Sequence, residues 1–170
     1  PLAEGGLIGG IYLSRRNLRG TSVDRLRAEI ADLQIRRQRA GLPPLIVAAD
    51  QEGGSVAHLS PLLETMPALA SVLAGPAVGV AARARAYGER QGAALADLGV
   101  TMNLAPVVDL KPPRPPSWID RHTRIGDRAI AADPETVARV AAAYSQGLRA
   151  GGVQPTVKHF PGLGGVRGDT

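Results

Sequence analysis

Residues 45–56 read LIVAADQEGGSV, a short apolar run that ends at polar and ionisable residues, Asp50, Gln51 and Glu52. An unbroken apolar run of this length is typical of a buried strand in a parallel sheet. Three more runs share the pattern, at residues 8–13, 101–108 and 156–157. Amphipathic helical patterns separate the four runs, and this alternation predicts a parallel α/β sheet with the order β-α-β-α-β-α-β.

Each predicted strand leads into polar side chains. The first is followed by Ser14, Arg15 and Asn17, the third by Asp109, and the fourth by Lys158 and His159. A (β/α)₈ barrel builds its active site at the carboxyl ends of all its strands. A doubly wound sheet gathers ligand groups at one switch point, and its dinucleotide-binding form needs G-x-G-x-x-G after the first strand. That fingerprint is missing here, so the barrel is favoured.

The three helical patterns carry recognisable end signals. The first follows Thr21, where Thr21 and Asp24 predict a capping box. The second covers about 80–98, with Gly99 at the expected C-terminal cap. The third begins at Asp133, followed by Pro134, a good N-cap with proline at the first helical position.

The length sets how much of a barrel the chain holds. A full barrel needs about 250 residues and eight strands, whereas the chain has 170 residues. We therefore expect about half of a TIM (β/α)₈ barrel, four βα units, forming one partial barrel domain over residues 1–170 with no second domain. An open half-barrel exposes sheet edges and an apolar face, so we expect self-association.

Composition narrows the function classes. The chain has no cysteine, which excludes disulfides, thiolate catalysis and cysteine metal sites. Its three histidines show no metal-ligand spacing, and we expect neither metal nor cofactor. The net charge is +5, but the basic residues are spread out and aromatic residues make up 3%, which argues against nucleic-acid binding. No apolar run reaches about 18 residues, so no membrane span is expected. The compartment stays open between the cytoplasm and export.

Five segments together carry a family resemblance: GGIYLSRRN (9–17), LIVAADQEGGSV (45–56), GVTMNLAPVVDL (99–110), TRIGDRAIAADP (123–134) and VKHFPGLG (157–164). In order and spacing the chain resembles the N-terminal domain of glycoside hydrolase family 3. It is most similar to the bacterial β-N-acetylglucosaminidase (β-hexosaminidase) branch, whose members act on cell-wall fragments.

The resemblance implies a sugar pocket made by Asp50, Arg128, Lys158 and His159. Asp50 would accept hydrogen bonds from ring hydroxyls, and Arg128 would donate to them. Charged partners make short, strong hydrogen bonds to hydroxyls, and a site that pairs each hydroxyl discriminates among sugars. Structural alternatives remain open: Asp50 as a turn cap, and Arg128 in a surface ion pair with Asp127 or Asp133.

The resemblance also implies retaining hydrolysis of a terminal β-linked sugar, with N-acetylglucosamine preferred. The alternatives are a β-glucosidase of the same family and a non-catalytic carbohydrate-binding barrel. The family's nucleophile, an aspartate in an S/T-D-D-like segment, has no match in this chain. Asp169 matches the aspartate that orients a histidine acid/base, which is expected just past Thr170. Leu163 departs from the family's KHFPGHG.

Several neighbouring residues receive other interpretations. Glu52 is interpreted as structural or as a support for the residues that contact the sugar, Asp109 as a structural or pocket-wall residue, and Gly53 and Gly54 as a tight turn near ligand. Trp118 is either a sugar platform or a packed loop residue. His58, which stands where relatives commonly have arginine, is assigned no role.

Overall fold

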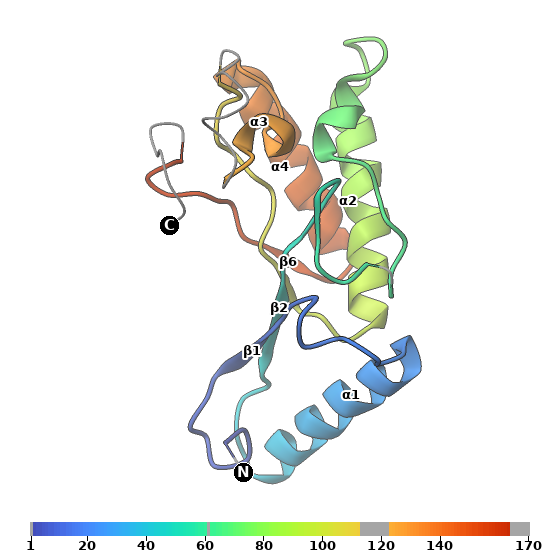
Figure 1. The fold of residues 1–170 in the computed structure, drawn as a ribbon, viewed down its shortest axis with the longest axis vertical. Helices are drawn as coiled ribbons and strands as arrows, with labels where there is room; N and C mark the ends of the chain where they lie inside the picture. The colour runs from blue at the N-terminus through green and yellow to red at the C-terminus, as the bar shows by residue number, and fades with distance from the viewer. Residues whose placement is uncertain (1, 61, 113–122, 164–170) are drawn as a thin grey trace.

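In the computed structural model, which describes residues 2–60, 62–112 and 123–163, a four-stranded parallel sheet forms the centre of the chain. Its strands are β1 (Gly10–Leu13), β2 (Ile46–Ala49), β5 (Met102–Asn103) and β6 (Gln154–Pro155). They lie side by side in chain order, each pair parallel (Figure 1). The predicted parallel α/β arrangement is confirmed.

The strands are shorter than predicted. The expected strand over 101–108 pairs regularly only at Met102–Asn103, and the fourth strand pairs at 154–155 rather than 156–157. Pro106 lies within the expected strand over 101–108 and has no N–H to donate to a ladder, whereas Pro155 is itself paired with Asn103. An isolated parallel bridge between Val107 and Lys158 continues the pairing beyond them. This bridge places Lys158 at the carboxyl end of the sheet.

Helix α1 (Val23–Arg39) begins one residue later than its capping signal predicted. Ser22 is the N-cap: its backbone is extended, and its side chain accepts a hydrogen bond from the backbone N–H of Arg25 at 3.2 Å. The capping box assigned to Thr21 and Asp24 is therefore wrong. The Thr21 hydroxyl is buried and has no hydrogen-bond partner among the described residues.

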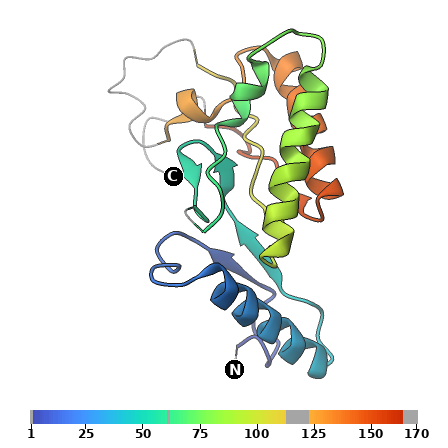
Figure 2. The same cartoon turned by 90° about the vertical axis from the view of Figure 1, so that its right-hand side faces the viewer.

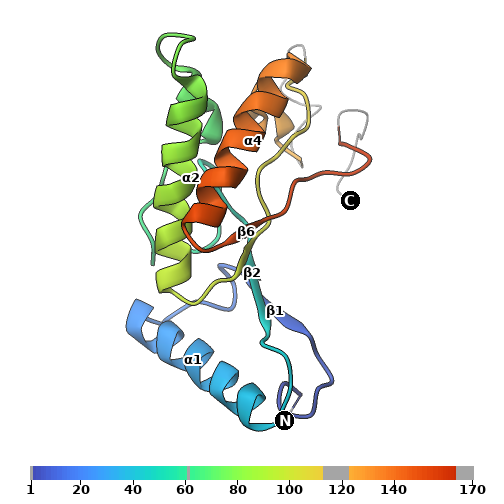
Figure 3. The ribbon, with the colours of Figure 1, turned by 180° about the vertical axis from the view of Figure 1, so that it is seen from behind.

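Helices α2 (Val80–Asp97) and α4 (Pro134–Ala150) pack against each other on one side of the sheet (Figure 3). Glycine makes their close contact possible: a Cβ on Gly88 would lie 2.3 Å from the Tyr144 carbonyl oxygen. The predicted N-cap of α4 is confirmed, since Asp133 accepts from Thr136 N–H at 2.8 Å. Gly99 follows α2 with a positive φ, as its predicted role requires. The best-buried core side chains include Val47, Leu59, Leu95, Leu98, Val140, Tyr144 and Leu148.

Four short elements were not predicted. Strands β3 (Gln51–Gly53) and β4 (Val56–Ala57) form an antiparallel hairpin directly after β2 (Figure 2). The 3₁₀ helix η1 (Leu69–Leu73) packs near α2, and the one-turn helix α3 (Ile125–Arg128) carries Arg128. Gly53 and Gly54 both have positive φ, which confirms the predicted turn. Within the described residues, no helix combines the length and apolarity needed to cross a membrane.

Candidate functional site

Lys158, beyond β6, contacts carboxylates that lie at and just after the end of β2. Its ammonium group forms ion pairs with the carboxylates of Asp50 and Glu52, the second at 2.6 Å. Asp50 directly follows β2, Glu52 lies in β3, and Lys158 follows β6. The three side chains are 16%, 19% and 7% exposed for Lys158, Asp50 and Glu52. They therefore form one largely shielded charge cluster.

Arg128 adds a guanidinium to the same cluster. Its Nε and Nη2 donate to the two carboxylate oxygens of Glu52 at 2.9 and 2.7 Å, and its Nη1 donates to the Thr123 carbonyl at 2.7 Å. Burial lowers the pKa of Arg128, but hydrogen bonds and charge from Glu52 outweigh burial and raise it. The surface ion pairs that were the alternative for Arg128 do not form. Asp127 pairs with Arg124, and Asp133 caps α4.

His159 is held by Asp109 on one side and Arg128 on the other. The His159 Nδ1 lies 2.5 Å from Asp109 Oδ2, and its Nε2 lies 3.3 Å from Arg128 Nη2. Arginine only donates, so Nε2 accepts and Nδ1 carries the hydrogen that it donates to Asp109. This geometry selects the neutral Nδ1–H tautomer of the imidazole.

The Asp109 carboxylate is stabilised in its charged form. Burial raises its pKa, but a 2.6 Å hydrogen bond from the Leu163 N–H and the contacts with His159 outweigh burial, so the pKa is lowered. Leu163, the residue that departs from the family sequence, thus contributes through its backbone. Asp109, interpreted from sequence as structural or pocket wall, positions a predicted sugar-binding residue.

Tyr12 and His58 extend the network beyond Asp50. The Tyr12 hydroxyl donates to Asp50 Oδ2 at 2.6 Å and lies 3.0 Å from His58 Nδ1. Because the hydroxyl has one hydrogen, His58 Nδ1 must be the donor in the second contact. Burial raises the pKa of Asp50, and hydrogen bonds from Lys158 and Tyr12 outweigh it, so that pKa is lowered. The pKa of Tyr12 is raised, mainly by burial and secondly by its hydrogen bond to the charged Asp50.

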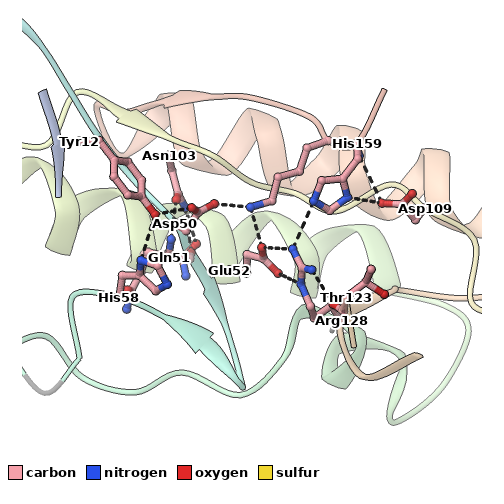
Figure 4. A network of polar contacts seen from close by, with 12 residues as sticks. Tyr12, Asp50, Gln51, Glu52, His58, Asn103, Asp109, Thr123, Arg128 and His159 are labelled. Atoms are coloured by element: carbon pink, nitrogen blue, oxygen red, sulfur yellow. Dashed lines mark hydrogen bonds and ion pairs between the residues drawn. The ribbon is translucent and has the colours of Figure 1, made fainter. Parts of the chain in front are cut away.

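Figure 4 shows these groups converging from segments that are far apart in the sequence. The structure brings together all four predicted sugar-pocket residues, Asp50, Arg128, Lys158 and His159. Asp169, predicted to orient the acid/base, lies outside the described residues, as does Trp118. The prediction missed the contributions of Tyr12 and His58, which carried no local sequence signal. Glu52, interpreted as structural or supporting, pairs with Arg128 and Lys158.

Within residues 2–60, 62–112 and 123–163, no group of three or more histidine or acidic side chains is arranged to hold a metal ion. Each charged side chain in the cluster faces an opposite charge or a hydrogen-bonding partner. The cluster thus presents both donors and acceptors, a combination suited to a ligand with several hydroxyl groups.

A parallel α/β sheet that gathers ionisable side chains at its carboxyl edge belongs to the class of fold in which barrel enzymes build their sites. A comparison with protein families identifies which family of this class the chain matches. The family model described as "Glycosyl hydrolase family 3 N terminal domain" matches residues 2–170. The chain belongs to this family.

Similar proteins with assigned names are beta-hexosaminidases. A beta-hexosaminidase of Xanthomonas campestris pv. campestris is 34% identical over 167 residues, which are 96% of this chain and 46% of the relative. The beta-hexosaminidase LpqI of Mycobacterium tuberculosis is 39% identical over 127 residues, 75% of this chain and 31% of that protein. The chain therefore spans about half the length, or less, of these relatives.

Solved structures give the same result for the fold. A beta-N-acetylhexosaminidase from Beutenbergia cavernae matches with a TM-score of 0.80 and 33% identity, over 98% of this chain and 48% of that one. NagZ from Neisseria gonorrhoeae, in complex with N-trifluoroacetyl-D-glucosamine, matches with a TM-score of 0.79 and 33% identity, over 96% and 45%. The predicted family and the predicted half of a (β/α)₈ barrel are both confirmed.

Proposed function

We propose that this chain is the sugar-binding half of a retaining glycoside hydrolase that removes terminal β-linked N-acetylglucosamine from cell-wall-derived glycans. The observation that carries the proposal is the convergence of Asp50, Arg128, Lys158 and His159 at the carboxyl edge of the sheet. Relatives named beta-hexosaminidase support the choice of sugar.

The hydrogen bonds already made leave capacity for a ligand. Asp50 uses one oxygen for Tyr12 and the other for Lys158, and each carboxylate oxygen accepts a second hydrogen bond. Lys158 has three N–H donors and two carboxylate partners, which leaves one donor. The ion pairs thus hold the side chains in place, while their remaining acceptor and donor positions bind sugar hydroxyls.

Bond cleavage is carried out by groups other than the four sugar-binding residues. The aspartate nucleophile lies outside residues 1–170, and Asp169 orients a histidine acid/base just past Thr170. A carboxylate beside an imidazole fixes its tautomer and keeps its pKa in a working range. Replacing Asp169 with alanine in the complete protein should lower turnover strongly. Unchanged turnover would remove Asp169 from the mechanism.

Residues 1–170 are proposed to form one partial barrel domain that is inactive and self-associates when isolated. Strands β1 and β6 are the two edges of the described sheet, and Val157 and Phe160, beyond β6, are 59% and 99% exposed. Open edges and exposed apolar side chains favour association. Analytical ultracentrifugation of the isolated chain should show oligomers, whereas a stable monomer would contradict this part of the proposal.

Hydrolysis of two substrates tests the activity. The complete protein should hydrolyse 4-nitrophenyl β-N-acetylglucosaminide faster than the corresponding β-glucoside. Turnover of the glucoside alone would identify a β-glucosidase instead. Binding of N-acetylglucosamine without turnover of either substrate would identify a non-catalytic carbohydrate-binding barrel.

A further inference from the structure

The residue between the two site carboxylates points away from them. Successive residues of an extended chain alternate between faces. Asp50 and Glu52 therefore share one face, and Lys158 pairs with both of them there. Gln51 faces the interior and is 2% exposed, and its Oε1 accepts a hydrogen bond from the Leu59 N–H at 2.9 Å. The backbone of Gln51 thus sets the direction in which both carboxylates point.

Asn103, at the end of β5, holds that backbone with two hydrogen bonds. Its Oδ1 accepts from the Gln51 N–H at 3.0 Å, and its Nδ2 donates to the Gln51 carbonyl at 2.9 Å (Figure 4). The N–H belongs to the peptide group that Gln51 shares with Asp50, and the carbonyl belongs to the peptide group that it shares with Glu52. One side chain therefore fixes both peptide planes that flank Gln51.

The Asn103 side chain continues the link between β2 and β5 where backbone pairing ends. The backbone link reaches Ala49, whose carbonyl accepts from the Leu104 N–H at 2.9 Å. Further along the second segment, Pro106 has no N–H to donate. The support of the site carboxylates therefore depends on the side chain of Asn103 rather than on a longer ladder.

A buried network orients the Asn103 amide. Asn103 is fully buried, and its Nδ2 also lies 3.1 Å from Tyr144 Oη and 3.3 Å from Gln91 Oε1. The Tyr144 hydroxyl donates to Gln91 Oε1, so both α2 and α4 contribute to this network. Reversing the amide would bring two donors together at the Gln51 N–H. The amide is therefore held in the one orientation that matches Gln51.

We infer that Asn103 is a positioning residue for the proposed hydrolysis, which acts through the Gln51 backbone and holds Asp50 in the orientation that binds the sugar. The same two hydrogen bonds hold Glu52 against its cationic partners. A misplacement of about 1 Å in such a group is enough to cost about a hundredfold in rate. The inference rests on the proposed function and adds to it a buried residue that contacts no substrate.

The test uses Asn103→Asp in the complete protein, because the new carboxyl supplies the missing donor only when it is protonated. The Gln51 carbonyl and Gln91 Oε1 face the position of Nδ2 and disfavour a carboxylate there, and burial raises the pKa of such a carboxyl. Tyr144 is the ionisable side chain in hydrogen-bond contact with Asn103, and burial raises its pKa, so it stays protonated. Relative to the wild type, kcat/KM on 4-nitrophenyl β-N-acetylglucosaminide should fall roughly a hundredfold at about pH 8 and recover at least about tenfold at about pH 5.

Thr101→Val is the matched control, because Thr101 links the same two segments at their other end. Its Oγ1 accepts from the Val47 N–H at 2.9 Å. This variant should have a lower urea midpoint and wild-type kcat/KM at both pH values. Asn103→Ser removes the amide without adding a charge, so its loss of kcat/KM should not recover at the lower pH. It carries the test if Asn103→Asp does not fold.

Wild-type kcat/KM in either folded Asn103 variant would overturn the inference. So would a loss in Asn103→Asp that is the same at both pH values, or an equal loss in Thr101→Val, because either result would reduce Asn103 to a stabilising residue. If the wild type hydrolyses neither 4-nitrophenyl substrate, the proposed function fails, and crystal structures of Asn103→Asp at both pH values decide the positioning role. An Asp50 carboxylate that moves away from Lys158 at the higher pH and returns at the lower pH would retain that role, and an unmoved carboxylate would reject it.

Discussion

Arg128 and Glu52 are separated by 76 residues, yet they form two parallel hydrogen bonds of 2.9 and 2.7 Å. Their side chains are 12% and 7% exposed. The pair fastens the one-turn helix α3 to the β3–β4 hairpin. It also fixes the guanidinium beside His159, so it sets the geometry of the proposed sugar-binding cluster.

Removing one partner of this pair should destabilise the protein, because it leaves the other charge buried without its counterion. We expect Glu52→Ala to lower the free energy of unfolding by about 3–5 kcal/mol in urea denaturation. The Glu52→Ala/Arg128→Ala double variant should lose less than the sum of the single losses. Glu29→Ala is the control, since Glu29 is 55% exposed and pairs with Arg25 within α1. Equal losses for Glu52→Ala and Glu29→Ala would contradict the structural role.

Gly53 should tolerate no side chain. Its φ is +95°, and a Cβ there would lie 2.2 Å from the Tyr87 hydroxyl and 2.5 Å from the Pro67 carbonyl oxygen. Gly20 has a φ of +75° with no atom within 4 Å of the corresponding position, so it isolates the backbone cost. Gly20→Ala should lose about 1–2 kcal/mol of unfolding free energy, and Gly53→Ala should lose clearly more. Equal losses would show that the turn relaxes without disturbing the site.

The acid limb of the stability curve should depend on Asp50 and Asp109. Both carboxyls have a native pKa below their usual value of 3.8, so the unfolded chain binds more protons than the native chain at acid pH. Their stabilisation is complete above the unfolded pKa and is lost as pH falls through the lower native pKa.

Asp109→Asn should therefore flatten the decline of unfolding free energy below about pH 5. Urea midpoints measured at a series of pH values check this expectation. Asp24→Asn, at a side chain that is 92% exposed, should keep the wild-type slope. A steep, unchanged slope in Asp109→Asn would mean that its contacts contribute nothing to acid sensitivity.

Two substitutions at the start of α1 distinguish the observed N-cap, Ser22, from the predicted one, Thr21. Ser22→Ala should cost about 1 kcal/mol of unfolding free energy, because the Ser22 hydroxyl accepts the Arg25 N–H. Thr21→Ala should cost less, since the Thr21 hydroxyl has no partner among the described residues. Circular dichroism during thermal unfolding measures both, and the reverse order would restore the Thr21 cap.

Sequence alone was sufficient for the architecture because its signals are local. Apolar runs at 8–13 and 45–49 and the Asp133–Pro134 cap each reflect neighbours in the chain, and they gave the order of strands and helices. The family motifs then named four residues that the structure brings together. The β3–β4 hairpin was missed because a pairing of three residues with two leaves almost no periodicity to detect.

The contacts that organise the site are long-range, and this is why sequence did not give them. Glu52 was interpreted as structural or supporting, but its partner Arg128 was not predicted, because the pairing depends on where α3 lies after the chain has folded. Asp109 and His159 stand 50 residues apart and meet only because their strand ends adjoin.

The most direct test of the sugar-binding assignment is kcat/KM of the complete Asp50→Asn protein on 4-nitrophenyl β-N-acetylglucosaminide, with Asp24→Asn as the matched control. The substitution removes the charge that strengthens hydrogen bonds to sugar hydroxyls and to Lys158, so we predict a loss of roughly a hundredfold for Asp50→Asn and wild-type kinetics for Asp24→Asn. A folded Asp50→Asn protein with kcat/KM close to that of the wild type would contradict the account.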